Sequence, residues 1–412
     1  MSAGERLGRG GAVIRESPAA AVRAAMTERT ARQQPVWPDR DALDLVEAEL
    51  TDLPGLTTED EVVDLARGMT LVAEGAGLVL QGGDCAERFH EAVPELVRRK
   101  VDHLQGLAAM LRAGSGLIGV AIGRLAGQYG KPRSSPFEPD PEEVGRTMAS
   151  YCGDAVNDPA PDPARRVPDP RRLRTAYDSS QVVLREVRRA WCGKPLEERV
   201  YAAHELLLLP YERSLVRDGV RGAFSAAAHF GWIGERTRGL GDAHVALAAG
   251  VHNPIGVKIG PTASPDDVVA LTRVLNPDGV PGRLSLILRY GADDVDRMLP
   301  PVVSAVARQG APVVWLCDPM HGNGLKLHGV KTRLVESMLA EVTSFVRVLV
   351  GHGQRPAGLH LELTPDPVTE CVSPQVANPT FPDYRSTCDP RLNPEQSVAL
   401  IAHFLDRLSW SG

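Results

Sequence analysis

The apolar run GLVL at residues 77–80 continues directly into QGGDCAERF at residues 81–89, which sets a cysteine between two acidic residues. An apolar run that ends in two glycines and a charged cluster is typical of a buried parallel strand whose carboxyl end delivers functional groups. Cys85 is therefore a candidate ligand. The competing interpretation is a buried cysteine in a strand-to-helix turn, and this stretch alone favours neither.

Composition limits the class of protein without naming its chemistry. The chain has 412 residues, of which 43% are hydrophobic and 24% charged, enough for one large α/β domain or two smaller ones. A net charge of −6 gives no reason to expect nucleic acid or a membrane surface as a partner. Six cysteines without a CxxC pair, and no apolar run of roughly 18 residues, predict a cytoplasmic protein with reduced thiols.

Apolar strand candidates recur along the chain with amphipathic helical stretches between most of them. Their number, eight, and the strand–helix alternation predict an α/β fold of the (β/α)8 TIM-barrel type. A doubly wound open sheet is the alternative. The predicted strands are 78–80, 117–122, 223–228, 255–259, 284–288, 313–316, 359–363 and a short one near Thr387.

Two regions depart from the repeat. Residues 1–33, with arginines and glutamates interspersed, are expected to form a disordered, solvated arm. Residues 34–412 are expected to form a single barrel domain, with an N-terminal helical extension over 34–76. An insertion over about 134–222, first rich in proline and then helical, is expected between strands 2 and 3.

Polar residues follow strand after strand at the expected mouth of the barrel. One such arginine is usually a surface ion pair, but several cations that converge on one face repel each other unless anions offset them. Arginine suits bidentate contact with phosphate or carboxylate, and lysine supplies a point charge. We therefore expect a small polyanionic substrate, or two. These cations are Arg124, Lys131, Arg133, Arg236, Lys258 and Arg289.

A second constellation at the same mouth combines a thiol, an imidazole and two carboxylates: Cys85, His321, Glu362 and Asp389. This mixed donor set suits manganese, iron, cobalt or zinc better than magnesium or calcium. Separate structural roles are the alternative, because no local metal motif such as HExxH is present. Only the shared position in the predicted fold groups the four residues.

Several long motifs resemble those of the type II (plant-type) 3-deoxy-D-arabino-heptulosonate 7-phosphate (DAHP) synthases, over roughly residue 34 to the C-terminus. They are QGGDCAERF at 81, GRLAGQ at 123, KPRS at 131, WIGERTR at 232, NPIGVKIGP at 253, CDPMHGN at 317, GVKTR at 329, HLE at 360 and CDPRLN at 388. The resemblance implies a (β/α)8 barrel that condenses phosphoenolpyruvate with erythrose 4-phosphate, the first step of the shikimate pathway. It also implies a divalent metal, with manganese as first choice and cobalt, iron or zinc as alternatives.

The resemblance also implies roles for particular residues. The metal ligands would be Cys85, His321, Glu362 and Asp389. Phosphoenolpyruvate would meet Arg124 and Lys131 through its carboxylate, and Lys258, Arg289, Glu235 and Arg236 through its phosphate. The aldose phosphate would lie towards Arg133, Ser134 and Arg236, with Lys331 near its reactive end and Glu205 at the site mouth. The candidate catalytic groups are Lys131, Glu235, Lys331 and Asp318, and Asp318 or Glu235 would orient the attacking water.

Departures from the family pattern qualify the assignment. The chain has YCGD at residues 151–154 where the family commonly has YRGD, and the stretch between Tyr177 and Tyr201 is short. Longer members carry there a helical pair associated with feedback by aromatic amino acids, so weak or absent inhibition by tryptophan is expected. An amino-DAHP synthase that uses an amino or imino aldose is the closest alternative. An inactive homologue that binds a chorismate mutase is an alternative of another class. A homo-oligomer is a further expectation. A reversible Cys85–Cys388 disulfide is a hypothesis, and a reduced, inert Cys388 thiol is the alternative.

Overall fold

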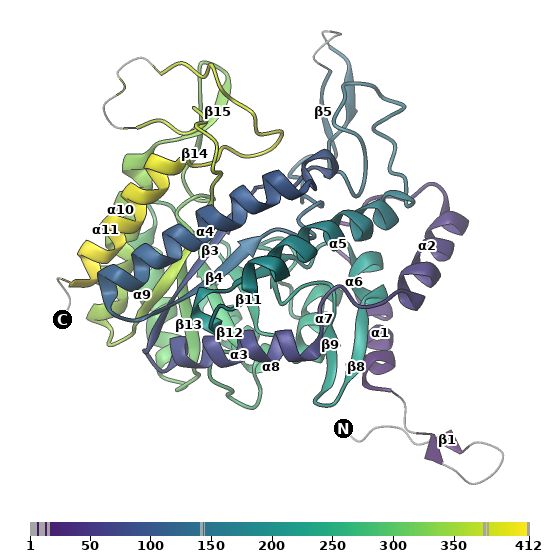
Figure 1. The fold of residues 1–412 in the computed structure, drawn as a ribbon, viewed down its shortest axis with the longest axis horizontal. Coiled ribbons are helices and arrows are strands. Elements are labelled where there is room, and N and C mark those ends of the chain that lie inside the picture. The colour runs from purple at the N-terminus through teal and green to yellow at the C-terminus, as the bar shows by residue number, and fades with distance from the viewer. Residues whose placement is uncertain are drawn as a thin grey trace.

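Eight parallel strands close a barrel at the centre of the computed structural model (Figure 1). The structure describes residues 6–7, 13–14, 17–140, 143, 145–373, 376 and 379–409. Around the barrel the strands follow the order β10-β11-β12-β13-β16-β3-β4-β7. Their bounds are β3 Gly77–Gly83, β4 Ile118–Arg124, β7 Val200–Glu205, β10 Phe230–Ile233, β11 Ile255–Ile259, β12 Leu284–Leu288, β13 Val313–Cys317 and β16 Pro356–Glu362. The predicted (β/α)8 barrel is confirmed.

Two of the eight predicted strands are wrong. Residues 223–228 contribute to β9 (Gly222–Ser225), which forms a hairpin with β8 (Val216–Gly219) outside the barrel. Around Thr387 the described chain has bends and no strand. The third and fourth barrel strands are β7 and β10 instead. Both are short, and the alanines of VYAAHE in β7 favour helix as readily as strand, so the apolar pattern did not reveal them.

Helices cover the outside of the barrel, and two of them begin with a capping box. Thr58 and Glu61 form a reciprocal capping box at the start of α3, and Ser264 and Asp267 do so at α8. The helices are α1 Pro18–Thr27, α2 Arg40–Asp52, α3 Glu59–Ala73, α4 Pro94–Ser115, α5 Arg172–Trp191, α6 Leu209–Ser214, α7 Ala243–Gly250, α8 Pro265–Leu275, α9 Val295–Ala307, α10 Val335–Gly351 and α11 Pro394–Ser409, with 3-10 turns at Phe89–Glu91 and Leu196–Glu198. The short strands outside the barrel are β1 Arg6–Leu7, β2 Val13–Ile14, β5 Phe137–Pro139, β6 Thr147–Ala149, β14 Gly324–Leu327 and β15 Val330–Arg333.

Residues 17–33 are ordered where disorder was expected. Helix α1 buries Ala19, Val22 and Met26, and it packs against α7 and the β8–β9 hairpin. In Figure 1, α1 and α2 lie on the same side of the barrel as α6 and α7, opposite α10 and α11. The expectation of a disordered arm over 1–33 is therefore wrong for residues 17–33. Of the remainder, residues 1–5, 8–12 and 15–16 lie outside the described residues.

The insertion between the second and third barrel strands ends earlier than expected. β4 ends at Arg124 and β7 begins at Val200, so the insertion spans 125–199 and the expected end at 222 is wrong. It carries the β5–β6 hairpin and then α5, which packs along α4. The β5 and β14–β15 hairpins project from the same end of the molecule (Figure 1). These excursions surround the barrel mouth, where the functional side chains gather.

Candidate active site

A cavity of about 910 Å³ opens at the carboxyl ends of the barrel strands. Thirteen of the fifteen predicted site residues line it, contributed by strand ends and loops far apart in the sequence. They are Cys85, Arg124, Lys131, Arg133, Ser134, Glu205, Glu235, Arg236, Lys258, Arg289, His321, Lys331 and Asp389. The other two, Asp318 and Glu362, are fully buried and contact residues that line the cavity. The structure thus brings together the whole predicted set.

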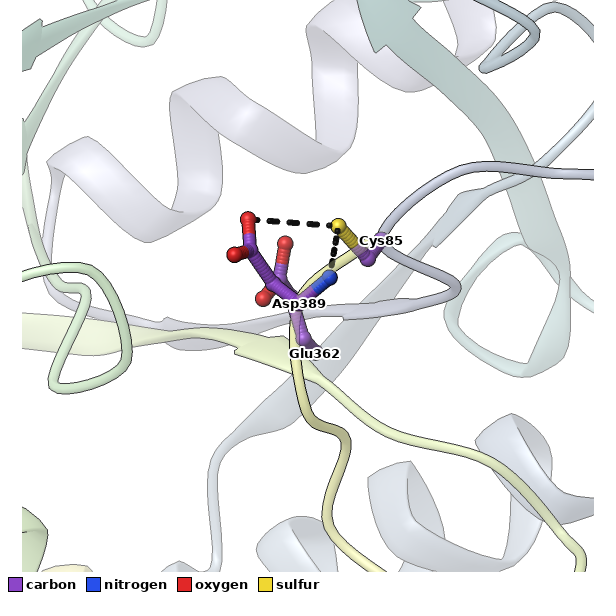
Figure 2. A group of neighbouring side chains, drawn as sticks. All are labelled: Cys85, Glu362 and Asp389. Atoms are coloured by element: carbon purple, nitrogen blue, oxygen red, sulfur yellow. Dashed lines mark hydrogen bonds between the residues drawn. The ribbon is translucent and has the colours of Figure 1, made fainter. Parts of the chain in front are cut away.

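Three of the four predicted metal ligands form a compact buried group. Cys85 follows β3, Glu362 ends β16, and Asp389 comes from the loop before α11 (Figure 2). One donor atom from each lies within 4.8 Å of the others. The backbone N–H of Asp389 donates to the Cys85 Sγ at 3.3 Å, and this sulfur lies 3.4 Å from the Asp389 Oδ2.

His321 lies beside this group rather than within it. Its Nε2 is 3.1 Å from the Glu362 Oε1, while its Nδ1 is 2.8 Å from the Asp318 Oδ2. An imidazole held by a carboxylate at Nδ1 presents Nε2 as the free ligand, the usual arrangement of a metal-binding histidine. The fourth predicted ligand is therefore next to the group and aimed at it.

Cations of the chain itself neutralise the acidic group. The Lys131 ammonium contacts both the Cys85 thiol and Asp389, and the Lys331 ammonium contacts Asp389. Burial opposes ionisation of Asp389, but the neighbouring cations, Lys131 first, outweigh it and lower the pKa of this carboxyl. Burial raises the pKa of the Cys85 thiol.

These contacts fit a divalent metal. The donors are a thiol, an imidazole and carboxylates in a buried pocket, and positive charge already lies against them. A bound divalent metal would replace the positive charge of these lysines. The thiol that coordinates it would lose its proton. The residues present therefore match the donor set of a manganese-, iron-, cobalt- or zinc-type ion.

Two buried arginines hold the outer side of the group. Arg124 donates from Nη2 to the Glu362 Oε1 at 3.0 Å, and Arg333 lies 2.8 Å from the Glu362 Oε2. The Arg124 guanidinium lies 5.2 Å from the centre of the Trp232 ring, which is buried beneath it. Trp232 therefore packs under the site. Buried charges arranged in pairs fix the geometry of Glu362.

A second buried ion pair links the histidine to a lysine. Lys258, at the end of β11, contacts Asp318, the same carboxylate that holds His321. Burial lowers the pKa of Lys258 to about 8, although Asp318 opposes the shift. Lys258 thus loses its charge at a lower pH than an exposed lysine does, and Asp318 lies between a candidate metal ligand and a candidate phosphate contact.

The opposite side of the cavity is more open. Arg133 pairs with Glu138 at 2.9 Å, and its side chain is 29% exposed. Arg236 is exposed and has no ion-pair or hydrogen-bond partner among the residues that the structure describes. Arg289 belongs instead to the metal-ligand side, where its Nη2 donates to the His321 carbonyl at 2.7 Å.

Glu205 comes from a barrel strand. It lies beside His204 at the end of β7, and it lines the cavity. Burial raises the pKa of Glu205, with Lys131 and Lys258 opposing the shift. His204 is instead a buried structural residue, 2.9 Å from the Glu212 Oε1.

Sequence reasoning missed several residues of the site. Arg333 lies in the GVKTR motif and His360 in the HLE motif, so both stood in quoted stretches but received no role. The Nε2 of His360 lies 2.6 Å from the Nη1 of Arg124. Arg32 and Gln33 also line the cavity, and no motif marked them.

The mouth of this closed parallel barrel contains a thiol–carboxylate group surrounded by many cations. This combination defines a class of enzyme, a barrel that can bind a metal and acts on anionic substrates. The model of the class-II DAHP synthetase family matches residues 22–198 and 192–404. The chain belongs to this family. Its members are metalloenzymes, and the Cys85 group is the buried candidate for the metal site.

Individual relatives agree with the family match. The chain is 37% identical over 425 residues to the phospho-2-dehydro-3-deoxyheptonate aldolase of Streptomyces coelicolor, covering 90% of this chain and 93% of the relative. It is 36% identical to the corresponding enzyme AroG of Mycolicibacterium smegmatis, over 90% and 91% of the two chains. The solved structure of the Francisella tularensis enzyme superposes with a TM-score of 0.57 at 13% identity, over 89% of this chain and 96% of the other, which supports the fold alone.

The helices of the described chain give no candidate for a membrane-crossing segment.

Proposed function

We propose that this protein condenses phosphoenolpyruvate with erythrose 4-phosphate and water to give DAHP and inorganic phosphate. The observation that carries the proposal is the presence, in one cavity, of a metal-capable group and of cations on two sides of it. The reaction needs two anions that repel each other to be held within bonding distance. Fixed cations hold the two anions together at a low cost in free energy, because the cations are already positioned before the substrates bind.

Phosphoenolpyruvate is assigned to the buried side of the cavity. Arg124 and Lys131 contact its carboxylate, and Lys258 and Arg289 contact its phosphate, with Glu235 and Arg236 at the rim. Arg124 is positioned by its own bonds, since Nε donates to the Asp84 carbonyl at 2.9 Å and the guanidinium stacks on Trp232. A guanidinium fixed in this way meets a carboxylate in one orientation.

Cys85, His321, Glu362 and Asp389 would hold a divalent ion, and manganese is the first choice among the metals that the donor set suits. When bound, such an ion acts as a Lewis acid that polarises the aldehyde of the aldose phosphate. With an ion held by Asp389, Lys131 and Lys331 would no longer be needed to neutralise this carboxylate and would contact the substrates. These two ammonium groups, beside the reacting atoms, would offset charge on the new hydroxyl oxygen and supply its proton.

The aldose phosphate is assigned to the open side. Arg133, Ser134 and Arg236 contact its phosphate, and Lys331 lies near its reactive end. C3 of phosphoenolpyruvate attacks the aldehyde carbon, water adds at C2, and phosphate leaves. Glu235 and Asp318 are the candidates for orienting the water. Of these, Asp318 already bonds His321 and Lys258, so Glu235, whose Oε2 is buried and without a hydrogen-bond partner in the described chain, is better placed.

The direct test measures phosphate release with phosphoenolpyruvate, erythrose 4-phosphate and Mn²⁺. We expect turnover that a chelator abolishes and Mn²⁺ restores. Competing the amino analogue of the aldose in the same assay distinguishes a DAHP synthase from an amino-DAHP synthase. Absence of turnover with every four-carbon aldose phosphate would contradict the proposal and favour an inactive homologue that binds a chorismate mutase.

Three further properties belong to the same proposal: a cytoplasmic location, assembly into homo-oligomers, and association with a chorismate mutase. Light scattering of the purified chain, alone and mixed with a chorismate mutase, tests the last two. A monomer that does not bind the added chorismate mutase would contradict both.

A further inference from the structure

The segment 30–34, just before α2, crosses the open side of the cavity and is tied to three loops of the barrel mouth. Thr30 forms a parallel β-bridge with Asp242, and the Ala243 N–H donates to the Thr30 carbonyl at 2.9 Å. The Gln34 side chain donates to the Leu207 carbonyl at 2.7 Å. We call residues 30–34 the strap. Its fixed path places Arg32 and Gln33, two of the three residues between these anchors, over the cavity.

Arg32 is anchored at one edge and open at the other. Its Nε donates to the Asp242 Oδ2 at 2.8 Å, and Asp242 is buried with a side chain 6% exposed. The Arg32 side chain is 60% exposed and lines the cavity, and its Nη atoms have no hydrogen-bond partner among the residues described. A guanidinium fixed through Nε keeps its two Nη groups available for an oxyanion.

Gln33 ties the strap to the loop that bears Arg133. The Gln33 Oε1 accepts from the Arg133 N–H at 3.0 Å. The backbone of Gln33 has a positive φ of 57°, a conformation that residues other than glycine and asparagine seldom adopt. The strap therefore joins the Arg133 loop to the loop between β10 and α7, which carries Arg236 and Asp242.

We propose that Arg32 is a third arginine contact for the phosphate of the aldose phosphate, and that the strap sets the spacing of Arg133 and Arg236 around that phosphate. The inference rests on the proposed function. Asp242 offsets the charge of Arg32 and Glu138 that of Arg133, and a phosphate dianion supplies the anion that Arg236 lacks, which explains how three arginines share one rim. The buried side, with Lys258 and Arg289, needs no contribution from Arg32.

The test compares R32Q with the wild type and with R29Q, which removes the same charge from an exposed residue three positions earlier that does not line the cavity. For R32Q we expect KM for erythrose 4-phosphate to rise about tenfold or more, because a hydrogen bond to a charged group is lost. KM for phosphoenolpyruvate, kcat and the melting temperature should stay near wild type. R32K should recover part of the loss, since it keeps the charge without the fork.

An unchanged KM for erythrose 4-phosphate in R32Q would overturn the inference, and so would an equal rise in both KM values or the same rise in R29Q. A wild-type protein without turnover would contradict the proposed function instead. Inorganic phosphate, titrated by calorimetry into wild type and R32Q, then decides the role of Arg32. Weaker binding by R32Q supports it, and equal binding overturns it.

Discussion

The two sides of the active-site cavity are built differently. On the metal-ligand side, Cys85, Glu362 and Asp389 are buried and satisfied by cations of the chain itself. On the opposite side, Arg32 and Arg236 are exposed and extend from loops and from the strap. The first side is desolvated and fixed before any ligand arrives, and the second depends on long-range contacts for its shape. Catalytic chemistry should therefore be sensitive to the first side and substrate selection to the second.

The largest effect is expected from removing the thiol. Cys85→Ala deletes a central donor of the metal group, so metal-dependent turnover should fall by more than the roughly 100-fold typical of outer contacts. The melting temperature should change little, and metal analysis after dialysis should show the ion lost. Cys192→Ala, an exposed cysteine at the end of α5, is the matched control. Full activity in Cys85→Ala would remove the cysteine from the site.

A smaller loss is expected when the support of the histidine is removed. Asp318→Asn weakens the bond to the His321 Nδ1 and the pair with Lys258, so metal affinity should fall about 10- to 100-fold. Titration of Mn²⁺ into the metal-free protein measures it. Asp366→Asn removes the same charge from a surface pair with Arg99 and should leave the affinity unchanged. Equal affinities in the two variants would show that Asp318 does not act on the metal.

The pH profile should report Lys258. Burial lowers its pKa to about 8, so the ammonium is present below that pH and lost above it. Because kcat/KM reports the free enzyme, its value for phosphoenolpyruvate should fall above pH 8, approaching tenfold per pH unit. The effect should be absent from Lys258→Arg, whose charge persists. If kcat/KM of Lys258→Arg still fell above pH 8, the fall would belong to the titration of another group.

The smallest effect is expected from tryptophan. A single helix, α5, and one 3-10 turn lead into β7, so the described chain has no helical pair at this position. Inhibition by tryptophan should therefore stay below the roughly fivefold effect at the lower end of typical allosteric coupling. Initial rates with and without tryptophan measure it. A clear drop would place a regulatory site elsewhere in the chain.

The same contrast between the two sides explains what could be predicted from the sequence. Cys85, Glu362 and Lys258 lie at strand ends, where a local apolar run and the polar residue after it reveal both the strand and the site. The barrel strand β7 was missed because its alanine-rich pattern is ambiguous. Arg32 could not be found, because contacts between distant parts of the sequence set its position. Its partner Asp242 lies 210 residues away in the sequence, and its neighbour Gln33 bonds Arg133, which is 100 residues away. Nothing local marks such contacts.

The most direct test of the central claim is a crystal structure with Mn²⁺ and phosphoenolpyruvate, using anomalous scattering to locate the metal. A peak among the Cys85 Sγ, the His321 Nε2 and the carboxylates of Glu362 and Asp389 is expected, with the Lys131 and Lys331 ammonium groups displaced from Asp389. A manganese bound elsewhere, with both lysines still on Asp389, would contradict the claim.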